Sequence, residues 1–238
     1  MIENSLRLAA RARGDRTVLT QIRGSGLLRA SRPFHEGAAA RVVVAHLGPG
    51  MIRGDAFALG GEVEPGAHLI VAGQMATRVL SGPAPATHAA GWHVAAGATL
   101  ELLPQPVLVS AGASYVGTTT IDLEPGARAV VTDVVQRDYG AAVRVTTLVR
   151  RGARLALADT LRLDADGDAS VVGTLLVFGD ADVGALDRAA ERCPGVRIGI
   201  GLLRDGDVLA RITGPGVREV DAALHTLLER GDDDASLR

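Results

Sequence analysis

TIDLEPGARAVV, residues 120–131, contains the pattern from which the fold of this 238-residue chain can be derived. An apolar, β-branched run leads into the turn Glu124–Ala127, and a second apolar run follows it. Proline fixes φ at the second position of the turn, and glycine supplies the positive φ that the third position needs. Because β-branched residues and an alternating pattern favour strands, the stretch predicts a strand, a tight turn and a returning strand.

The same Gly-Ala turn recurs at Gly66, Gly97, Gly126 and Gly152, at spacings of 31, 29 and 26 residues. Repeats at this period are typical of stacked supersecondary units that share one core. Glycine and β-branched residues are too frequent for the known helical repeats. We therefore expect a mainly β fold, with a stacked β-hairpin or β-helix-like body over residues 1–178. A plain β-sandwich with similar turns is the alternative.

After Phe178 the apolar residues adopt helical spacing. Asp180 or Asp182 can cap a helix that ends before Pro194. A strand, an Asp-Gly turn, a returning strand and a second amphipathic helix follow. The sequence predicts a small α+β part with two helices over residues 179–232, packed on the β body. Residues 233–238 are expected to form a frayed tail.

Composition excludes several classes of protein. The net charge of -2 gives no electrostatic footprint for nucleic acid. No apolar run reaches the roughly 18–20 residues that a membrane-spanning helix needs, so no membrane partner is expected. A single cysteine, Cys193, permits no intrachain disulfide and fits a reducing compartment. We expect a cytoplasmic protein.

Catalytic and metal-binding signatures are weak. Asp164, Asp166 and Asp168 resemble the start of a calcium loop, but Gly167 is misplaced and Leu175 stands where the loop needs glutamate. The six histidines form no pair with the spacing of a zinc site on a helix. A phosphate-binding P-loop is excluded because the chain has no lysine. No enzyme and no tightly bound cofactor are therefore predicted.

The order of five segments resembles the UreD family of urease accessory proteins, also called UreH. The segment GATLELLPQP at 97–106 is similar to the family's Gly-Ala-x-Leu-Glu-x-Leu-Pro-Gln. The other four segments are 24–33, 46–55, 66–79 and 122–127.

Several positions depart from the family's pattern. Ala72 and Gly73 stand in place of Thr-Thr, and Leu80 in place of tyrosine; an acidic stretch survives only in part, as Asp133, Gln136, Arg137 and Asp138. The chain is thus identified as a divergent member of the family.

This resemblance implies a non-catalytic β scaffold, a chaperone of urease maturation in urea metabolism. Such a protein binds apo-urease and UreF, which recruits the GTPase UreG, and together they insert nickel into urease. The family's β structure is thought to hold a water-filled passage. The resemblance implies transient nickel, no tightly bound cofactor, and possible homodimers within a larger complex.

Three acidic residues are candidates for transient nickel contact: Asp55, Glu101 and Asp133. Carboxylate and water are accepted ligands of Ni²⁺, and weak binding lets an ion leave again. Asp55 is the leading candidate because Gly54, beside it in the family's Gly-Asp segment, lets the backbone approach closely. The other interpretation of Asp55 is a turn residue at the end of a strand.

The remaining candidates are structural or partner-binding residues. Gln74 and Arg78 match family positions and could line the passage or lock the strands. Pro104, Gln105 and Pro106 are expected to shape an edge or bend, because proline cannot donate to a central ladder.

Two other functions compete with the scaffold. The first is a β-solenoid binding module, for instance for carbohydrate, although aromatic residues are only 3% of the chain and Trp92 is its one tryptophan. The second is an enzyme on a β-helix scaffold, which needs acids or bases gathered on one face.

Overall fold

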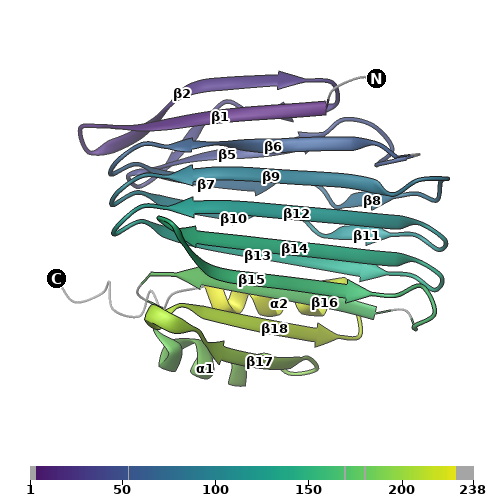
Figure 1. The fold of residues 1–238 in the computed structure, drawn as a ribbon. Coiled ribbons are helices and arrows are strands. Elements are labelled where there is room, and N and C mark those ends of the chain that lie inside the picture. Colours follow the sequence, from purple (N-terminus) through teal and green to yellow (C-terminus); the bar gives the residue numbers. More distant parts are fainter. Residues whose placement is uncertain (1–3, 53, 169, 180, 229–238) are drawn as a thin grey trace.

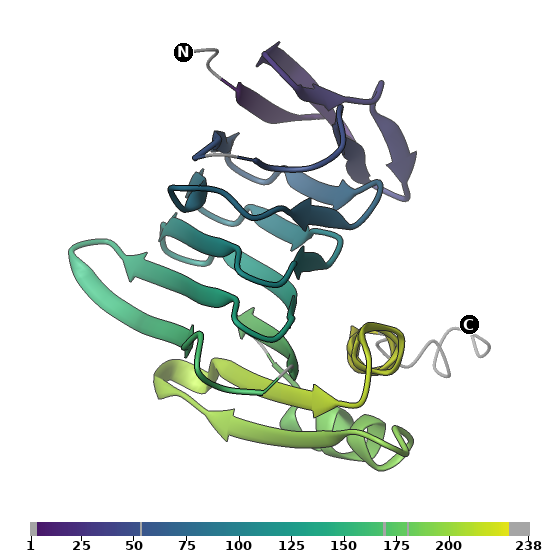
Figure 2. The same cartoon turned by 90° about the vertical axis from the view of Figure 1, so that its right-hand side faces the viewer.

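A computed structural model describes residues 4–52, 54–168, 170–179 and 181–228. Two β-sheets face each other along most of the length of the molecule and form a flattened solenoid (Figures 1 and 2). The helices lie at the C-terminal end, against the outer face of the second sheet. The mainly β, β-helix-like fold class with two C-terminal helices is therefore confirmed.

The first sheet contains, in spatial order, β15 (Arg154–Leu163), β14 (Ala142–Arg151), β12 (Ser114–Leu123), β9 (Ala86–Val94), β6 (Ala56–Val63), β1 (Asn4–Arg13) and β2 (Arg16–Ser25).

The second sheet contains β17 (Arg197–Leu202), β18 (Val208–Gly214), β16 (Ser170–Phe178), β13 (Arg128–Arg137), β10 (Thr99–Leu103), β7 (His68–Gly73), β5 (Ala39–His46) and β3 (Leu28–Ala30). Three short strands join it at the side: β4 (Phe34–Glu36), β8 (Thr77–Val79) and β11 (Val107–Val109).

Each central coil of the solenoid crosses from the first sheet to the second. The chain runs β6–β7–β8, then β9–β10–β11, then β12–β13, and each strand pairs in parallel with its equivalent in the next coil. The turns at Gly66, Gly97 and Gly126 therefore connect two different sheets, with φ of 68°, 66° and 73°. Our expectation of a hairpin at these three turns was wrong, because the two strands that flank each turn lie in opposite sheets.

The fourth Gly-Ala turn does form a hairpin. Gly152 joins β14 and β15, which pair antiparallel with one register shift after Val149. A second set of turns, at Gly112 and Gly140, stacks on the opposite edge of the solenoid with φ of 70° and 75°. These glycines also precede alanine, and sequence analysis did not include them.

Alternation of side chains fills the space between the sheets. Leu69, Leu100 and Ala129 occupy equivalent inward positions on β7, β10 and β13, and each is fully buried. Ile121 and Leu123 face them from the first sheet. Each fully buried large apolar side chain contributes about 1.5–3 kcal/mol to folding, so these rows hold the coils together.

The C-terminal part continues the second sheet and covers its outer face. Helix α1 (Val183–Glu191) is capped by Asp182, whose Oδ1 accepts from the Ala185 amide at 2.9 Å. Helix α2 (Val217–Leu228) packs Val220 and Leu224 on outward residues of β13, β16 and β18. Both predicted helices are confirmed, and Asp182 is the cap. The alternative cap, Asp180, and the tail at 233–238 lie outside the described residues.

The proposed boundary at 178/179 stays a prediction, and the second sheet runs across it, since β16 pairs with β18. None of the helices described is long and apolar enough to cross a membrane.

Replacing Gly97 by alanine tests the sheet-to-sheet turns. A Cβ at Gly97 meets no atom within 4 Å, so its only cost is the positive φ, about 1–2 kcal/mol for an L-residue. We expect Gly97→Ala to lower the free energy of urea unfolding by that amount. Gly199→Ala on β17 is the matched control, because Gly199 has equal space and no positive φ. Equal unfolding energies for the two variants would contradict the account of the turns.

Candidate functional site

A cavity of about 150 Å³ lies between the two sheets. It extends from Leu28 and His46 in the first coils to Asp133 and Thr147 further along the solenoid. A smaller cavity of about 10 Å³ continues from there to Arg211 on β18. The two cavities share part of their lining, so together they follow the solenoid axis. The shared residues are Val131, Thr132, Asp133, Val145 and Thr147.

Strand register brings polar side chains into line inside the solenoid. On the second sheet Asp133 pairs with Thr174, which pairs with Arg211. On the first sheet Thr119 pairs with Thr147, which pairs with Asp159. All six residues line one or both cavities. We call these six residues the polar strip.

Asp133 is the carboxylate at the centre of the polar strip. Burial raises its pKa to about 6, against the opposing effects of the Arg211 charge and a hydrogen bond from the Val134 amide. Arg211 itself binds both carboxylate oxygens of Asp159, at 2.5 and 2.7 Å, and donates to Thr174. Asp133 therefore changes its charge near neutral pH, while Asp159 carries the ion pair.

Aromatic and imidazole groups line the cavity nearer the N-terminus. Burial, together with the charge of His46, lowers the pKa of His88 to about 4. Burial also lowers the pKa of His46, whose ring lies 4.0 Å from that of Phe57. Both imidazoles are thus neutral at neutral pH. Trp92 Nε1 is buried and meets no acceptor in the described part of the chain. Since buried donors are nearly always satisfied, this indole indicates water in the cavity.

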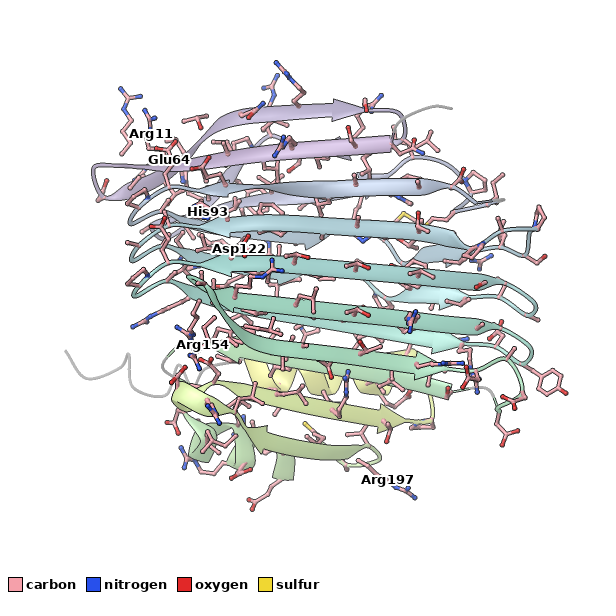
Figure 3. All side chains as sticks on the ribbon, in the orientation of Figure 1. Arg11, Glu64, His93, Asp122, Arg154 and Arg197 are labelled. Carbon is pink, nitrogen blue, oxygen red and sulfur yellow. The ribbon has the colours of Figure 1, made fainter. Side chains whose placement is uncertain are left out.

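Charge on the outside of the solenoid contrasts with this interior. Arg11 binds Glu64 at 2.6 Å, and Asp122 lies 3.7 Å from Arg150 on the outer face of the first sheet (Figure 3). His93, five residues after the inward His88, points outward toward Glu124 at 3.2 Å. Exposed pairs of this kind contribute little to stability, typically about 0–1 kcal/mol. The charged groups relevant to a functional site are therefore the few that line the cavities, Asp133, Asp159 and Arg211.

The acidic turn at 164–168 holds a guanidinium. Arg137 is 4% exposed and donates from its two Nη atoms to the carbonyl oxygens of Asp164 and Asp168. A Cβ on Gly167 would lie 2.8 Å from one of those Nη atoms. The carbonyls of this turn therefore serve an arginine, which agrees with the rejection of a calcium loop from the sequence.

Comparison with protein families now adds to the geometry. The model of the UreD urease accessory protein family matches residues 3–235, nearly the whole chain. The chain belongs to the UreD family. The resemblance identified from the sequence is confirmed.

Individual UreD relatives match about half of this chain. A urease accessory protein UreD of Delftia acidovorans is 41% identical over 127 residues, 52% of this chain and 41% of that protein. The UreD protein of Pseudomonas putida is 36% identical over 118 residues, 49% of this chain and 43% of that protein. That of Streptomyces avermitilis is 38% identical over 122 residues, 49% and 48% of the two chains. The matches span less than half of these relatives' lengths.

The three acidic UreD candidates lie in three different environments. Asp133 lies in the cavity. Asp55 lies in an edge turn, where its Oδ2 accepts from the Ile52 amide at 2.8 Å, and its charge raises the pKa of nearby His46. Glu101 lies on the outer face of the second sheet and contacts His68 Nε2 at 2.7 Å. The described residues contain no group of three metal-binding side chains.

The remaining candidates surround a break in the second sheet. Gln74 and Arg78 are exposed and lie outside the cavity lining; the Gln74 amide donates to the Val44 carbonyl at 3.0 Å. Pro104 and Gln105 line the cavity where β10 ends and β11 has yet to begin. The neighbouring coil approaches closely there, since a Cβ on Gly73 would lie 2.5 Å from the Gln105 amide nitrogen. Pro106 accepts from the Thr77 amide at 2.9 Å, and Gly54 has a φ of 77° in the edge turn beside Asp55.

Five residues of the polar strip escaped sequence analysis: Thr119, Thr147, Asp159, Thr174 and Arg211. One usable signal was present. Asp159 stands at an inward position between Leu157 and Leu161, and Thr147 stands between Val145 and Val149, so each interrupts an apolar inward row. A polar residue in an inward row marks either an error in the register or a functional interior, and only the strand pairing distinguishes these.

Asp133→Asn tests the buried carboxylate through pH. The folded pKa of about 6 lies above the reference 3.8, so between these values the folded state keeps a proton that the unfolded state has lost. Stability from this group is therefore present below the window and lost as the pH rises through it, by on the order of 2–3 kcal/mol. We expect Asp133→Asn to exceed the wild type in unfolding free energy at about pH 7.5, with the gain shrinking toward about pH 4.

Chemical denaturation at several pH values measures this difference. Comparing two chains cancels the opposite trend from His88, whose lowered pKa makes the protein more stable as the pH rises. A difference that stays constant with pH would show that folding does not shift the pKa of Asp133.

Proposed function

We propose that this chain is a non-catalytic accessory protein of urease maturation that binds apo-urease and conducts Ni²⁺ along its polar strip. The observation that carries the proposal is the cavity that follows the solenoid axis with Asp133 at its centre. Membership of the UreD family supports the accessory role. Nickel is here the cargo, and no resident cofactor is part of the proposal.

The donor set of the strip suits transient contact with a divalent cation. Ni²⁺ accepts carboxylate, imidazole, carbonyl and water ligands. The strip offers one carboxylate free of the Arg211–Asp159 pair, together with the hydroxyls of Thr119 and Thr147. Conduction requires sites that bind well enough to admit an ion and weakly enough to release it. A single buried carboxylate with water meets that requirement better than a complete cage.

The second part of the proposal concerns the proteins that this chain binds and the compartment in which it acts. We propose that the chain binds the urease apoprotein and UreF, and reaches UreG through UreF, in the cytoplasm, with homodimers as one possible arrangement inside the larger complex. The names of the UreD relatives support urease maturation. The outer face of the first sheet carries charged side chains such as Arg150, which could serve such contacts (Figure 3).

The carbohydrate-binding alternative loses its main support. Trp92 is 3% exposed and lies in the core, so it cannot stack on a sugar. Tyr139 and Phe34 are exposed but belong to a turn and a short strand in separate parts of the chain. A sugar platform needs neighbouring aromatic faces, and these two do not provide one.

Deletion of the gene for this protein should leave urease present but without its nickel. In a deletion strain we expect normal urease protein, little bound nickel and little activity. Complementation with Asp133→Asn should restore less activity per urease than the wild type, because the variant lacks the carboxylate in the cavity. Asp122→Asn on the outer face is the matched control and should restore activity fully. Metal analysis of purified urease measures the nickel. Normal activity in the deletion strain would end the proposal.

Asp55 is tested separately because it lies outside the cavity lining. We expect Asp55→Ala to lower urease activation while the protein still folds, since the variant removes a charge that acts on His46. Thermal unfolding and the complementation assay measure the two properties. Unchanged activation together with unchanged stability would show that Asp55 has no role.

A further inference from the structure

An ion pair joins the two sheets where the cavity ends. Arg211 of β18 binds both oxygens of Asp159 of β15 at 2.5 and 2.7 Å. The strands belong to opposite sheets, and no backbone pairing between them is present in the described chain. The side chains are 27% and 19% exposed, so the pair lies at the boundary between cavity and solvent.

Asp133 lies behind this pair. The small cavity is lined by Asp133 of β13 and Thr147 of β14, and by Arg211 of β18 and Asp159 of β15, which lie further toward the C-terminal end of each sheet. The charge of Arg211 reaches Asp133, since it lowers the pKa of that carboxyl against the effect of burial. A cation that moves from Asp133 toward solvent in this direction must pass the guanidinium.

We propose that Arg211, held by Asp159, is a gate that closes the C-terminal end of the polar strip to divalent cations. The inference rests on the proposed role of the strip as a cation route. The guanidinium at this place stands in the passage, and a cation can pass only after Asp159 releases it. The gate opens when Asp159 exchanges the guanidinium for the arriving cation and the Arg211 side chain turns into solvent. Arg211 and Asp159 are thus positioning residues for release.

A purely structural role explains the geometry less well. The β14–β15 hairpin is already tied to the C-terminal part by two other ion pairs, Arg151–Asp207 at 2.6 Å and Arg154–Asp205. Neither pair lines the two cavities described above. Arg154 lies at the edge of the solenoid where the hairpin turns, away from the polar strip (Figure 3). It provides a matched control, an arginine that joins the same elements outside the passage.

Cavity accessibility tests the gate without urease. A reporter chain carries Thr147→Cys in a Cys193→Ala background, and a small cationic methanethiosulfonate modifies the thiol. We expect Arg211→Ala to raise the modification rate by about tenfold or more, equivalent to ~1.4 kcal/mol of barrier. Arg154→Ala should leave the rate unchanged. Equal rates with and without Arg211, in chains whose thermal unfolding shows them folded, would overturn the gate.

A second substitution that restores urease activation distinguishes a gate from a purely structural role of the Arg211–Asp159 pair. In Asp159→Asn the freed guanidinium turns to Asp133 and occupies the passage, so we expect urease activation at limiting nickel to fall by roughly tenfold. Adding Arg211→Gln should restore activation, because nothing then blocks the strip. A double variant as poor as the single one would overturn the inference. If Asp133→Asn leaves activation normal, the cation route itself fails, while the labelling result still decides whether Arg211 closes the cavity.

Discussion

Backbone pairing between successive coils is the constraint on which the rest of the structure depends. Each central coil hydrogen-bonds to the next in parallel register, as in the alignment of β9 with β12 over residues 86–94 and 115–123. Register decides which side chains face inward, because a shift of one residue turns a whole strand over. The glycine turns keep that register by reversing the chain in the same place in every coil. Core, cavity and polar strip all follow from it.

The polar strip makes the interior less stable than a fully apolar one would be. Burying a hydroxyl or carboxylate without full compensation is unfavourable, and Asp133 shows it through its raised pKa. Leu69, Leu100 and Ile121 pack tightly along the adjacent inward rows, so the polar groups are confined to one line. A line of polar groups with room for water between two apolar walls differs from a loosely packed core. In the proposed function, these groups would offer a cation a set of weak partners across several coils.

Sequence reasoning reached the fold class because turns and strands are local. The residues next to Gly66, Gly97 and Gly126 are enough to predict the turns. In the same way, the apolar spacing around Leu186 and Leu224 is enough to predict the helices. The pairing of strands is not local, because the turn at Gly126 has the same sequence pattern whether it closes a hairpin or links two sheets. The polar strip was hidden for this reason. Asp133 could be proposed from a family pattern, whereas strand pairing alone brings Thr174 and Arg211 near it, from 41 and 78 residues further along the chain.

Crystals of the protein soaked with Ni²⁺, with diffraction data collected on both sides of the nickel absorption edge, test the central claim most directly. The account predicts anomalous density inside the solenoid, within coordinating distance of the Asp133 carboxylate and accompanied by ordered water. Density confined to exposed histidines such as His225, with a dry interior beside Asp133, would contradict it.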